Sequence, residues 1–102
     1  MENNHIISIE KAIEITSNYQ NSPNFNNQTI ACKIDNSSLL NLISQPNCES
    51  SRFYFAIENN LLTLVIIGVD NNNSDITTGV ILDKTEKCPL NCDINSVLMQ
   101  NQ

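Results

Sequence analysis

The chain has 102 residues and a mass of 11.4 kDa, the size of one ordinary domain. Its 5 lysines and arginines against 11 aspartates and glutamates give a net charge of −6. This charge argues against a nucleic-acid partner and against docking on an anionic membrane surface, because both need clustered basic side chains. The longest apolar run, Leu61 to Val69, is too short to insert across a membrane.

The N-terminal residues predict a cytoplasmic location. Met1 to His5 carry no basic segment and lead into no long apolar segment, whereas a secretory signal has both. In a reducing compartment, the 4 cysteines are more typical of free thiols or metal ligands than of a disulfide framework.

The first expected element is an amphipathic helix from Ser8 to about Gln20. Ser8 suits the N-cap, and Glu10 in the first turn suits the positive end of the helix dipole. The polar stretch from Asn21 to Gln28 is expected to be a loop. The expected buried face of this helix has apolar or small side chains at helical spacing: Ile9, Ala12, Ile13, Thr16 and Tyr19.

A short strand and a second helix follow. Thr29 to Ile34 alternates in the way that a strand does. Residues 35–37 offer N-caps for a helix from Ser38 to Ser44, which Pro46 ends because proline cannot continue a helix. The buried stripe of this helix is expected to consist of Leu39, Leu40 and Ile43.

The next segment predicts a β-hairpin. Arg52 to Glu58 alternates between two faces, as a half-buried strand does. Asn59 and Asn60 predict a two-residue type I′ turn, because asparagine tolerates positive φ. Leu61 to Val69 is apolar on both faces, which is typical of a central strand.

Beyond the hairpin, a turn from Asp70 to Asp75 leads to a third strand from Ile76 to Leu82, interrupted by Gly79. Asparagine is over-represented, with 18 residues. Many of them lie in short clusters between the apolar segments, where asparagine serves turns.

These elements predict one small α+β domain over residues 1–102, with residues 1–6 frayed and a loop-like, cysteine-containing tail from about residue 84. The expected architecture is a mostly antiparallel sheet of about three to four strands, with two helices packed on one face. The expected core residues are Ile9, Ile13, Leu39, Ile43, Phe53, Phe55, Leu64, Ile66 and Val80.

The cysteines are the main chemical lead. Thiolates are soft ligands for zinc or an iron–sulfur cluster, and four of them satisfy a tetrahedral ion. Cys88 and Cys92 lie close together around Pro89, and Cys48 lies just after the proline that ends the second helix. The sequence therefore predicts a metal or cluster site made by Cys48, Cys88 and Cys92, with Cys32 or an outside ligand as the fourth member.

Two other interpretations of the cysteines stay open. Cys88 and Cys92 are close enough in sequence to form a disulfide, which would suit a thiol redox role. Alternatively, the cysteines are buried thiols that pack as small hydrophobic side chains. The spacing is C-x-x-x-C with no second pair, whereas structural zinc sites typically use two C-x-x-C pairs.

Two side chains suggest a surface for a protein partner. Arg52 and Tyr54 share one face of the predicted strand with Glu58, and this face is either a recognition surface or an ordinary solvated face. The strand that ends at Glu58, or the strand beyond Ile76, is a candidate sheet edge to which a partner's strand could be added.

Several segments together resemble a known family. They are Gln45-Pro46-Asn47-Cys48, Arg52-Phe53-Tyr54-Phe55, Gly68-Val69-Asp70 and Cys88-Pro89-Leu90-Asn91-Cys92. They resemble a group of small bacterial proteins of unknown function that have a QPGC…RIYFG segment, a GVD…D turn and a C-terminal CPxxC motif. The resemblance covers residues 8–98, roughly, with Asn47 where the pattern has glycine and Ala56 at the end of the aromatic strand.

The resemblance implies that Cys48, Cys88 and Cys92 are the matching positions and that Cys32 is additional. It implies no activity. The residues themselves show no glycine-rich phosphate loop and no compelling pair of carboxylates for acid–base catalysis. The leading hypothesis is therefore a non-enzymatic module that binds a protein partner, and the alternative is a metal-binding or thiol redox protein.

Overall fold

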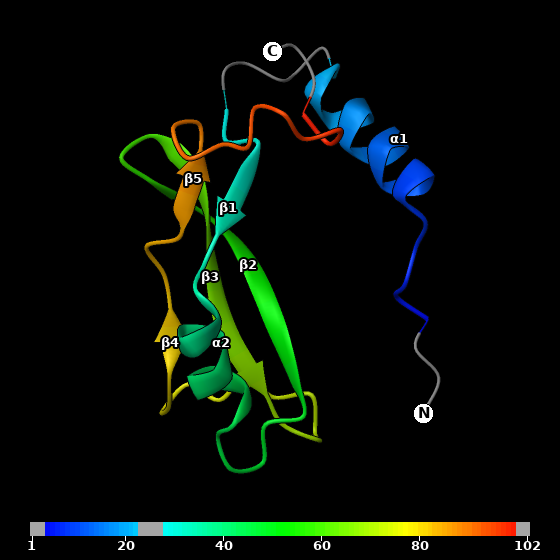
Figure 1. The fold of residues 1–102 in the computed structure, drawn as a ribbon. Coiled ribbons are helices and arrows are strands. Elements are labelled where there is room, and N and C mark those ends of the chain that lie inside the picture. The colour runs from blue at the N-terminus through cyan, green and yellow to red at the C-terminus, as the bar shows by residue number, and fades with distance from the viewer. Residues whose placement is uncertain (1–3, 23–27, 100–102) are drawn as a thin grey trace. The chain divides into compact units, whose positions relative to one another are not determined.

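The computed structural model describes residues 4–22 and 28–99, which contain two helices and five strands (Figure 1). They belong to two compact units, Met1–Gln28 with Cys92–Gln102, and Thr29–Asn91. Every strand pair is antiparallel, so the predicted α+β class with a small antiparallel sheet is confirmed. The predicted frayed residues 1–3 and the predicted loop residues 23–27 lie outside the described residues.

Helix α1, Ile9–Gln20, belongs to the first unit and confirms the first predicted helix. The Oγ of Ser8 accepts a hydrogen bond from the Lys11 backbone N–H at 3.0 Å, which makes Ser8 the predicted N-cap. At the other end, the buried Gln20 side chain donates to the Leu98 carbonyl at 3.1 Å. Ile9 is exposed instead of lying in the expected core.

The second unit contains two separate sheets rather than one. Strands β2, Ser50–Glu58, β3, Leu61–Val69, and β4, Ile81–Leu82, form a sheet in the order β2-β3-β4. Strands β1, Ala31–Lys33, and β5, Glu86–Cys88, form the other sheet. Residues 86–88, which the sequence placed in a loop-like tail, are therefore a strand that pairs with β1.

The hairpin between β2 and β3 is the best-predicted element. Asn59 and Asn60 have φ of 54° and 67°, the left-handed conformation that a type I′ turn requires. The turn sets the register, which runs from Glu58 opposite Leu61 to Ser50 opposite Val69. Asn47 and Asn73 also have positive φ, so in a chain with 2 glycines asparagine supplies most of the left-handed positions.

Helix α2, Asn36–Ile43, contacts β3 and β4. Its fully buried side chain is Leu42, whereas Leu40 and Ile43 are exposed. The predicted stripe of Leu39, Leu40 and Ile43 is therefore wrong at its last two residues and misses Leu42, while Leu39 is half-buried. The helix has leucines at three of four successive positions, so periodicity alone does not choose the face that the sheet buries.

The core of the three-stranded sheet lies on β3. Ile66 is 1% exposed, and Ile67, Gly68 and Val69 are also buried. The expected core residue Ile66 is confirmed, but Phe53 and Phe55 on β2 are exposed and were wrongly assigned to the core. β2 is the outer strand of this sheet, and the contacts of α2 within the second unit are with β3 and β4.

The predicted third strand is shorter than expected. Ile81–Leu82 forms β4, and Asp75 makes a single bridge to Val69. Between them the chain bends around the Gln45 side chain, whose Oε1 accepts from the Val80 backbone N–H at 2.7 Å. A Cβ on Gly79 would lie 2.0 Å from that oxygen, so any larger residue here must displace the Gln45 amide from its hydrogen bond to Val80.

Candidate functional site

The structure does not bring the predicted metal ligands together. Cys88 and Cys92 are disulfide-bonded, whereas Cys32 and Cys48 are free thiols. Within residues 4–22 and 28–99, no group of three or more His, Cys, Asp or Glu side chains is placed to hold a metal ion. The predicted zinc or iron–sulfur site stays a prediction, and in this structure two of its proposed ligands are occupied by a sulfur–sulfur bond.

The two free cysteines lie in different places. Cys32 lies in β1, opposite Lys87 of β5. Cys48 lies between α2 and β2, with its Sγ 3.4 Å from the Ser50 carbonyl oxygen. Its thiol also closes against β3, because a Cβ on Gly68 would lie 2.8 Å from that sulfur. Cys48 therefore fills the space over Gly68.

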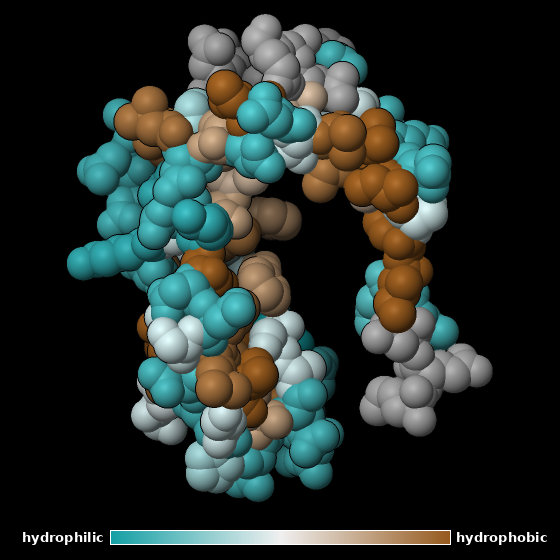
Figure 2. Space-filling model, in the orientation of Figure 1, coloured by the Kyte–Doolittle hydropathy of each residue, from teal (hydrophilic) through white to brown (hydrophobic). Residues whose placement is uncertain are grey.

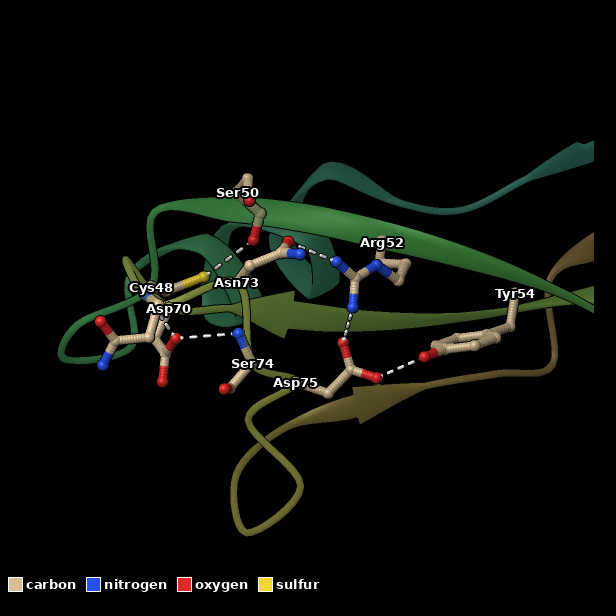
Figure 3. A network of polar contacts seen from close by, with 9 residues as sticks. Cys48, Ser50, Arg52, Tyr54, Asp70, Asn73, Ser74 and Asp75 are labelled. Atoms are coloured by element: carbon tan, nitrogen blue, oxygen red, sulfur yellow. Dashed lines mark hydrogen bonds and ion pairs between the residues drawn. The ribbon is translucent and has the colours of Figure 1, made fainter.

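Arg52 and Tyr54 are held by a polar network on one face of the sheet (Figure 3). The Arg52 Nη1 donates to Asp75 Oδ1 at 2.5 Å, and its Nη2 donates to Asn73 Oδ1 at 2.6 Å. The Tyr54 hydroxyl donates to the other oxygen of Asp75. The predicted pair is thus joined by one carboxylate from the turn after β3.

Local conformation explains why this network forms. Arg52 and Tyr54 are two residues apart in β2 and so point to the same face. The turn after β3 is held by Asp70, whose Oδ1 accepts from the backbone N–H groups of Asn72 and Ser74 at 2.9 and 3.0 Å. This turn brings Asp75 alongside Val69, from where its carboxylate meets both β2 side chains.

The network has a structural character. A side-chain hydrogen bond with Tyr54 and then the charge of Asp75 raise the pKa of Arg52, so the guanidinium remains charged. Both oxygens of Asp75 accept hydrogen bonds from side chains of β2. The arrangement ties the turn to β2 and presents a half-exposed Arg52. Sequence reasoning missed Asp75 and Asn73, since only the fold places this turn beside β2.

The backbone of β2 provides a second candidate site. In a two-residue hairpin, the residues that flank the turn, here Glu58 and Leu61, exchange backbone hydrogen bonds. Because hydrogen-bonded positions alternate along an antiparallel strand, every second residue from Glu58 back to Ser50 directs its N–H and C=O groups at β3. The other end agrees, since the Glu49 N–H donates to the Val69 carbonyl at 2.8 Å beside the Ser50–Val69 pair. The intervening residues Phe53, Phe55 and Ile57 direct their backbone N–H and C=O groups away from β3. We call these backbone groups the outer edge of β2.

The opposite side of β3 shows the same alternation and is occupied. The Ile76 N–H donates to the Gly68 carbonyl at 2.8 Å, and the Thr29 hydroxyl donates to the Leu62 carbonyl at 2.5 Å. Strand β4 pairs with Ile66 and Ile67 between these two points. On the outer edge of β2, by contrast, no described residue hydrogen-bonds the backbone groups of Phe53, Phe55 or Ile57.

The side chains beside the outer edge are apolar and exposed. Phe55 is 80% exposed, Ile57 is 77% exposed, and Phe53 on the same face is 49% exposed. We call these three side chains the apolar row. Figure 2 shows apolar atoms among polar ones on the visible surface of this unit, where α2 lies in front of the sheet. An apolar row beside unpaired backbone groups is the kind of surface to which an extended segment binds.

An open cavity of about 460 Å³ lies at the end of α2, lined by Gln45, Pro46, Asn47, Asp70, Asp75, Ile76, Thr77, Thr78 and Gly79. The Gln45 amide already bonds the Leu42 carbonyl and the Val80 N–H. In the described part of the chain, no buried side-chain oxygen or nitrogen lacks a hydrogen-bond partner. The cavity therefore has no buried side-chain polar atom left without a hydrogen-bond partner among the described residues.

No family model, curated protein or solved structure matches this chain. The resemblance to small bacterial proteins of unknown function stays a prediction. In the described ranges, neither helix is long and apolar enough to cross a bilayer.

Proposed function

We propose that this chain is a non-enzymatic protein-binding module that receives an extended strand of a protein partner along the outer edge of β2. The observation that carries the proposal is the conjunction of unpaired backbone groups and exposed apolar side chains over Phe53 to Ile57. Strand addition uses both, since the backbone supplies affinity and the alternate side chains supply specificity.

β2 lacks the features that usually protect an edge strand from pairing with another chain. Natural edge strands are protected by short length, proline, bulges or inward-pointing charges. β2 is 9 residues long, and residues 51–58 contain neither proline nor glycine. Its two charges, Arg52 and Glu58, lie on the face opposite the apolar row. The middle of the strand is thus an open edge that a partner can extend.

Proline substitution offers a direct test. The N–H of Phe55 points away from β3, so Phe55→Pro removes an outer-edge donor while the hydrogen bonds between β2 and β3 are kept. Random peptides displayed on phage are selected on the immobilised chain, and the affinities of selected peptides are measured by interferometry. We expect Phe55→Pro to weaken binding by at least about tenfold, because hydrogen bonding along the added strand is interrupted.

Phe55→Ala is the matched control, because it removes the same side chain and retains the backbone N–H. It should bind the selected peptides more weakly than the original chain but more tightly than Phe55→Pro. Circular dichroism and urea unfolding establish that both variants keep the fold. Equal binding by the two variants, or the selection of no peptide at all, contradicts strand addition at this edge.

A second candidate function is thiol redox chemistry at Cys88 and Cys92, which we propose because this pair is disulfide-bonded while Cys32 and Cys48 are free. A disulfide is typical of an oxidising compartment, whereas a cytoplasmic chain would carry the pair reduced or use it transiently. The redox state of this pair also decides metal binding by Cys48, Cys88 and Cys92, because a disulfide must be reduced to thiolates before its sulfurs can be metal ligands.

Elemental analysis and a thiol count, on protein purified without chelator and without air, separate these cases. Two reactive thiols in denaturant and no metal support the disulfide-bonded pair. Four reactive thiols without metal contradict a stable disulfide and leave the cytoplasmic location standing. One zinc ion or cluster per chain, with thiols protected until the metal is removed, supports the metal site instead.

A further inference from the structure

We propose that the strand received by β2 is the β2 strand of a second copy of this chain, paired antiparallel about a two-fold axis at Phe55. This inference rests on the proposed function, because it names the partner of the same edge. A two-fold contact is isologous, so each copy contributes the same surface and the surface must complement itself. β2 meets this condition in its backbone and in its side chains.

The backbone condition concerns which residues face outward. In an antiparallel pair, two residues that exchange hydrogen bonds must both direct their N–H and C=O groups at the other strand. An axis at Phe55 places Phe55 opposite Phe55 and Phe53 opposite Ile57, all of which belong to the outer edge. An axis at Tyr54 would also oppose outward residues, so the side chains must choose between the two.

The side chains favour the axis at Phe55. There, Arg52 of one copy lies directly opposite Glu58 of the other, once on each side of the axis. Opposite charges directly across an antiparallel pair stabilise it, and like charges destabilise it. An axis at Tyr54 would place Arg52 opposite Ala56 and Glu58 opposite Ser50. The only two charges of residues 50–58 are therefore paired in one register and unpaired in the other.

Glu58 is available for this pairing. Its side chain is exposed and makes no hydrogen bond or ion pair with the residues that the structure describes. Arg52 is bound to Asp75 and Asn73 through its two terminal nitrogens, but a guanidinium has five N–H donors. Asp75 bridges Val69 on the side of β3 away from β2, so the Arg52 guanidinium extends across β3. Pairing with Glu58 of the second copy therefore requires the guanidinium to turn toward the outer edge or to use its remaining N–H donors.

The apolar row is self-complementary in the same register. On its face, Phe55 meets its own copy, and Phe53 meets Ile57 on either side. Aromatic pairs and aromatic–β-branched pairs are among the favourable cross-strand neighbours. The two three-stranded sheets would join into one continuous six-stranded sheet (2 × 3 strands), and the exposed row would become an internal seam.

Site-directed cross-linking tests the axis in the full chain. Cys32→Ser and Cys48→Ser remove the free thiols, and Phe55→Cys is then added to that background. At the proposed axis the two Cα atoms lie about 5.5 Å apart, within the range of a disulfide. Phe53→Cys is the matched control. Residue 53 of one copy lies opposite residue 57 of the other, so the two cysteines are offset by four residues, about 13 Å along the strand.

Mild oxidation should give covalent dimers of the Phe55→Cys chain and at least tenfold fewer of the Phe53→Cys chain. Sedimentation velocity of the original chain should show a monomer–dimer equilibrium that moves to monomer in Phe55→Pro and in Glu58→Arg. The double variant Arg52→Glu with Glu58→Arg restores opposite charges across the axis and should recover the dimer if it folds.

Equal cross-linking of the two cysteine variants, or a chain that stays monomeric, overturns the pairing. The peptide selection described above uses no second copy, so the two proposals can fail separately. A monomeric chain that still binds peptides in a Phe55→Pro-sensitive way disproves self-pairing alone. Loss of both results disproves the open edge as a binding site.

Discussion

The two strands of the hairpin have the same length but differ in burial. β3 has four successive buried residues, Ile66 to Val69, whereas no residue of β2 is buried. α2 and β4 contact β3, while among the described strands β2 pairs with β3 alone. Burial in this sheet thus follows the elements that cover it: the exposed Phe53 and Phe55 of β2 are as apolar as the buried residues of β3.

The difference gives β2 and β3 different roles. An exposed aromatic edge strand lowers the solubility of a chain, because it can pair with the edge strand of another chain. A covered strand such as β3 carries the stability of the unit instead. Substitutions on the two strands separate these roles, and those on β3 should matter most to folding.

Removing the core side chain of β3 should have the largest effect. Ile66 is 1% exposed, and Ile66→Ala should lower the free energy of unfolding by about 2–4 kcal/mol through lost burial and the cavity left behind. Its cross-strand partner Phe53 is half exposed in the single chain, so at concentrations where the chain is monomeric Phe53→Ala should cost no more than about 1 kcal/mol. Urea unfolding measures both. A larger loss for Phe53→Ala would mean that β2 is covered in solution.

The sequence predicted this hairpin well because its signals are local. The turn residues Asn59 and Asn60 and the bounds of β3 depend on backbone conformation and on residues close in the chain. Whether Phe55 is core or surface depends on what lies across the sheet, and alternation in one strand carries no such information. For the same reason, the sequence does not show that Leu42 is the buried leucine of α2 or that Asp75 binds Arg52.

Filling the space over β3 should have the next largest effect. A Cβ on Gly68 would lie 2.8 Å from the Cys48 Sγ and 3.0 Å from the Gln45 Nε2, so Gly68→Ala must displace one of them. Overpacking of this kind costs about 1–3 kcal/mol. Its cross-strand partner on the open strand is Ser51, and Ser51→Ala should change stability by less than about 0.5 kcal/mol. Similar losses in both variants would contradict the distinction between the covered and the open strand.

The turn that connects the covering helix to the sheet should be sensitive to its backbone conformation. Asn47 has φ of 67°, a conformation that costs most residues about 1–2 kcal/mol and that glycine and asparagine tolerate. Asn47→Ala should therefore lower stability by about 1 kcal/mol, while Asn47→Gly should leave it nearly unchanged. Thermal unfolding of the two variants tests this. Equal stability of both would indicate that the loop relaxes and that the positive φ is not required.

The smallest expected effect concerns the N-cap of α2, the helix that covers β3. Hydrogen bonds from the side chain of Ser37 and then from the backbone and side chain of Ser38 lower the pKa of Asp35 from 3.8 to about 2. A carboxyl group whose pKa is lower in the folded state stabilises the fold above its unfolded pKa, so this contribution is lost as the pH falls from about 4 through about 2.

Asp35→Asn tests the origin of this acid sensitivity. Asparagine is an equally good N-cap but does not titrate, so the variant should lose less stability than the original chain between pH 4 and pH 2. Urea unfolding at a series of pH values measures the difference. Because α2 contacts β3 and β4, acid should expose the amides of β3 to hydrogen exchange before it affects the β2–β3 turn. If both variants share one pH profile, the loss of stability comes from carboxylates outside the helix, and the cap of α2 does not govern how β3 is covered.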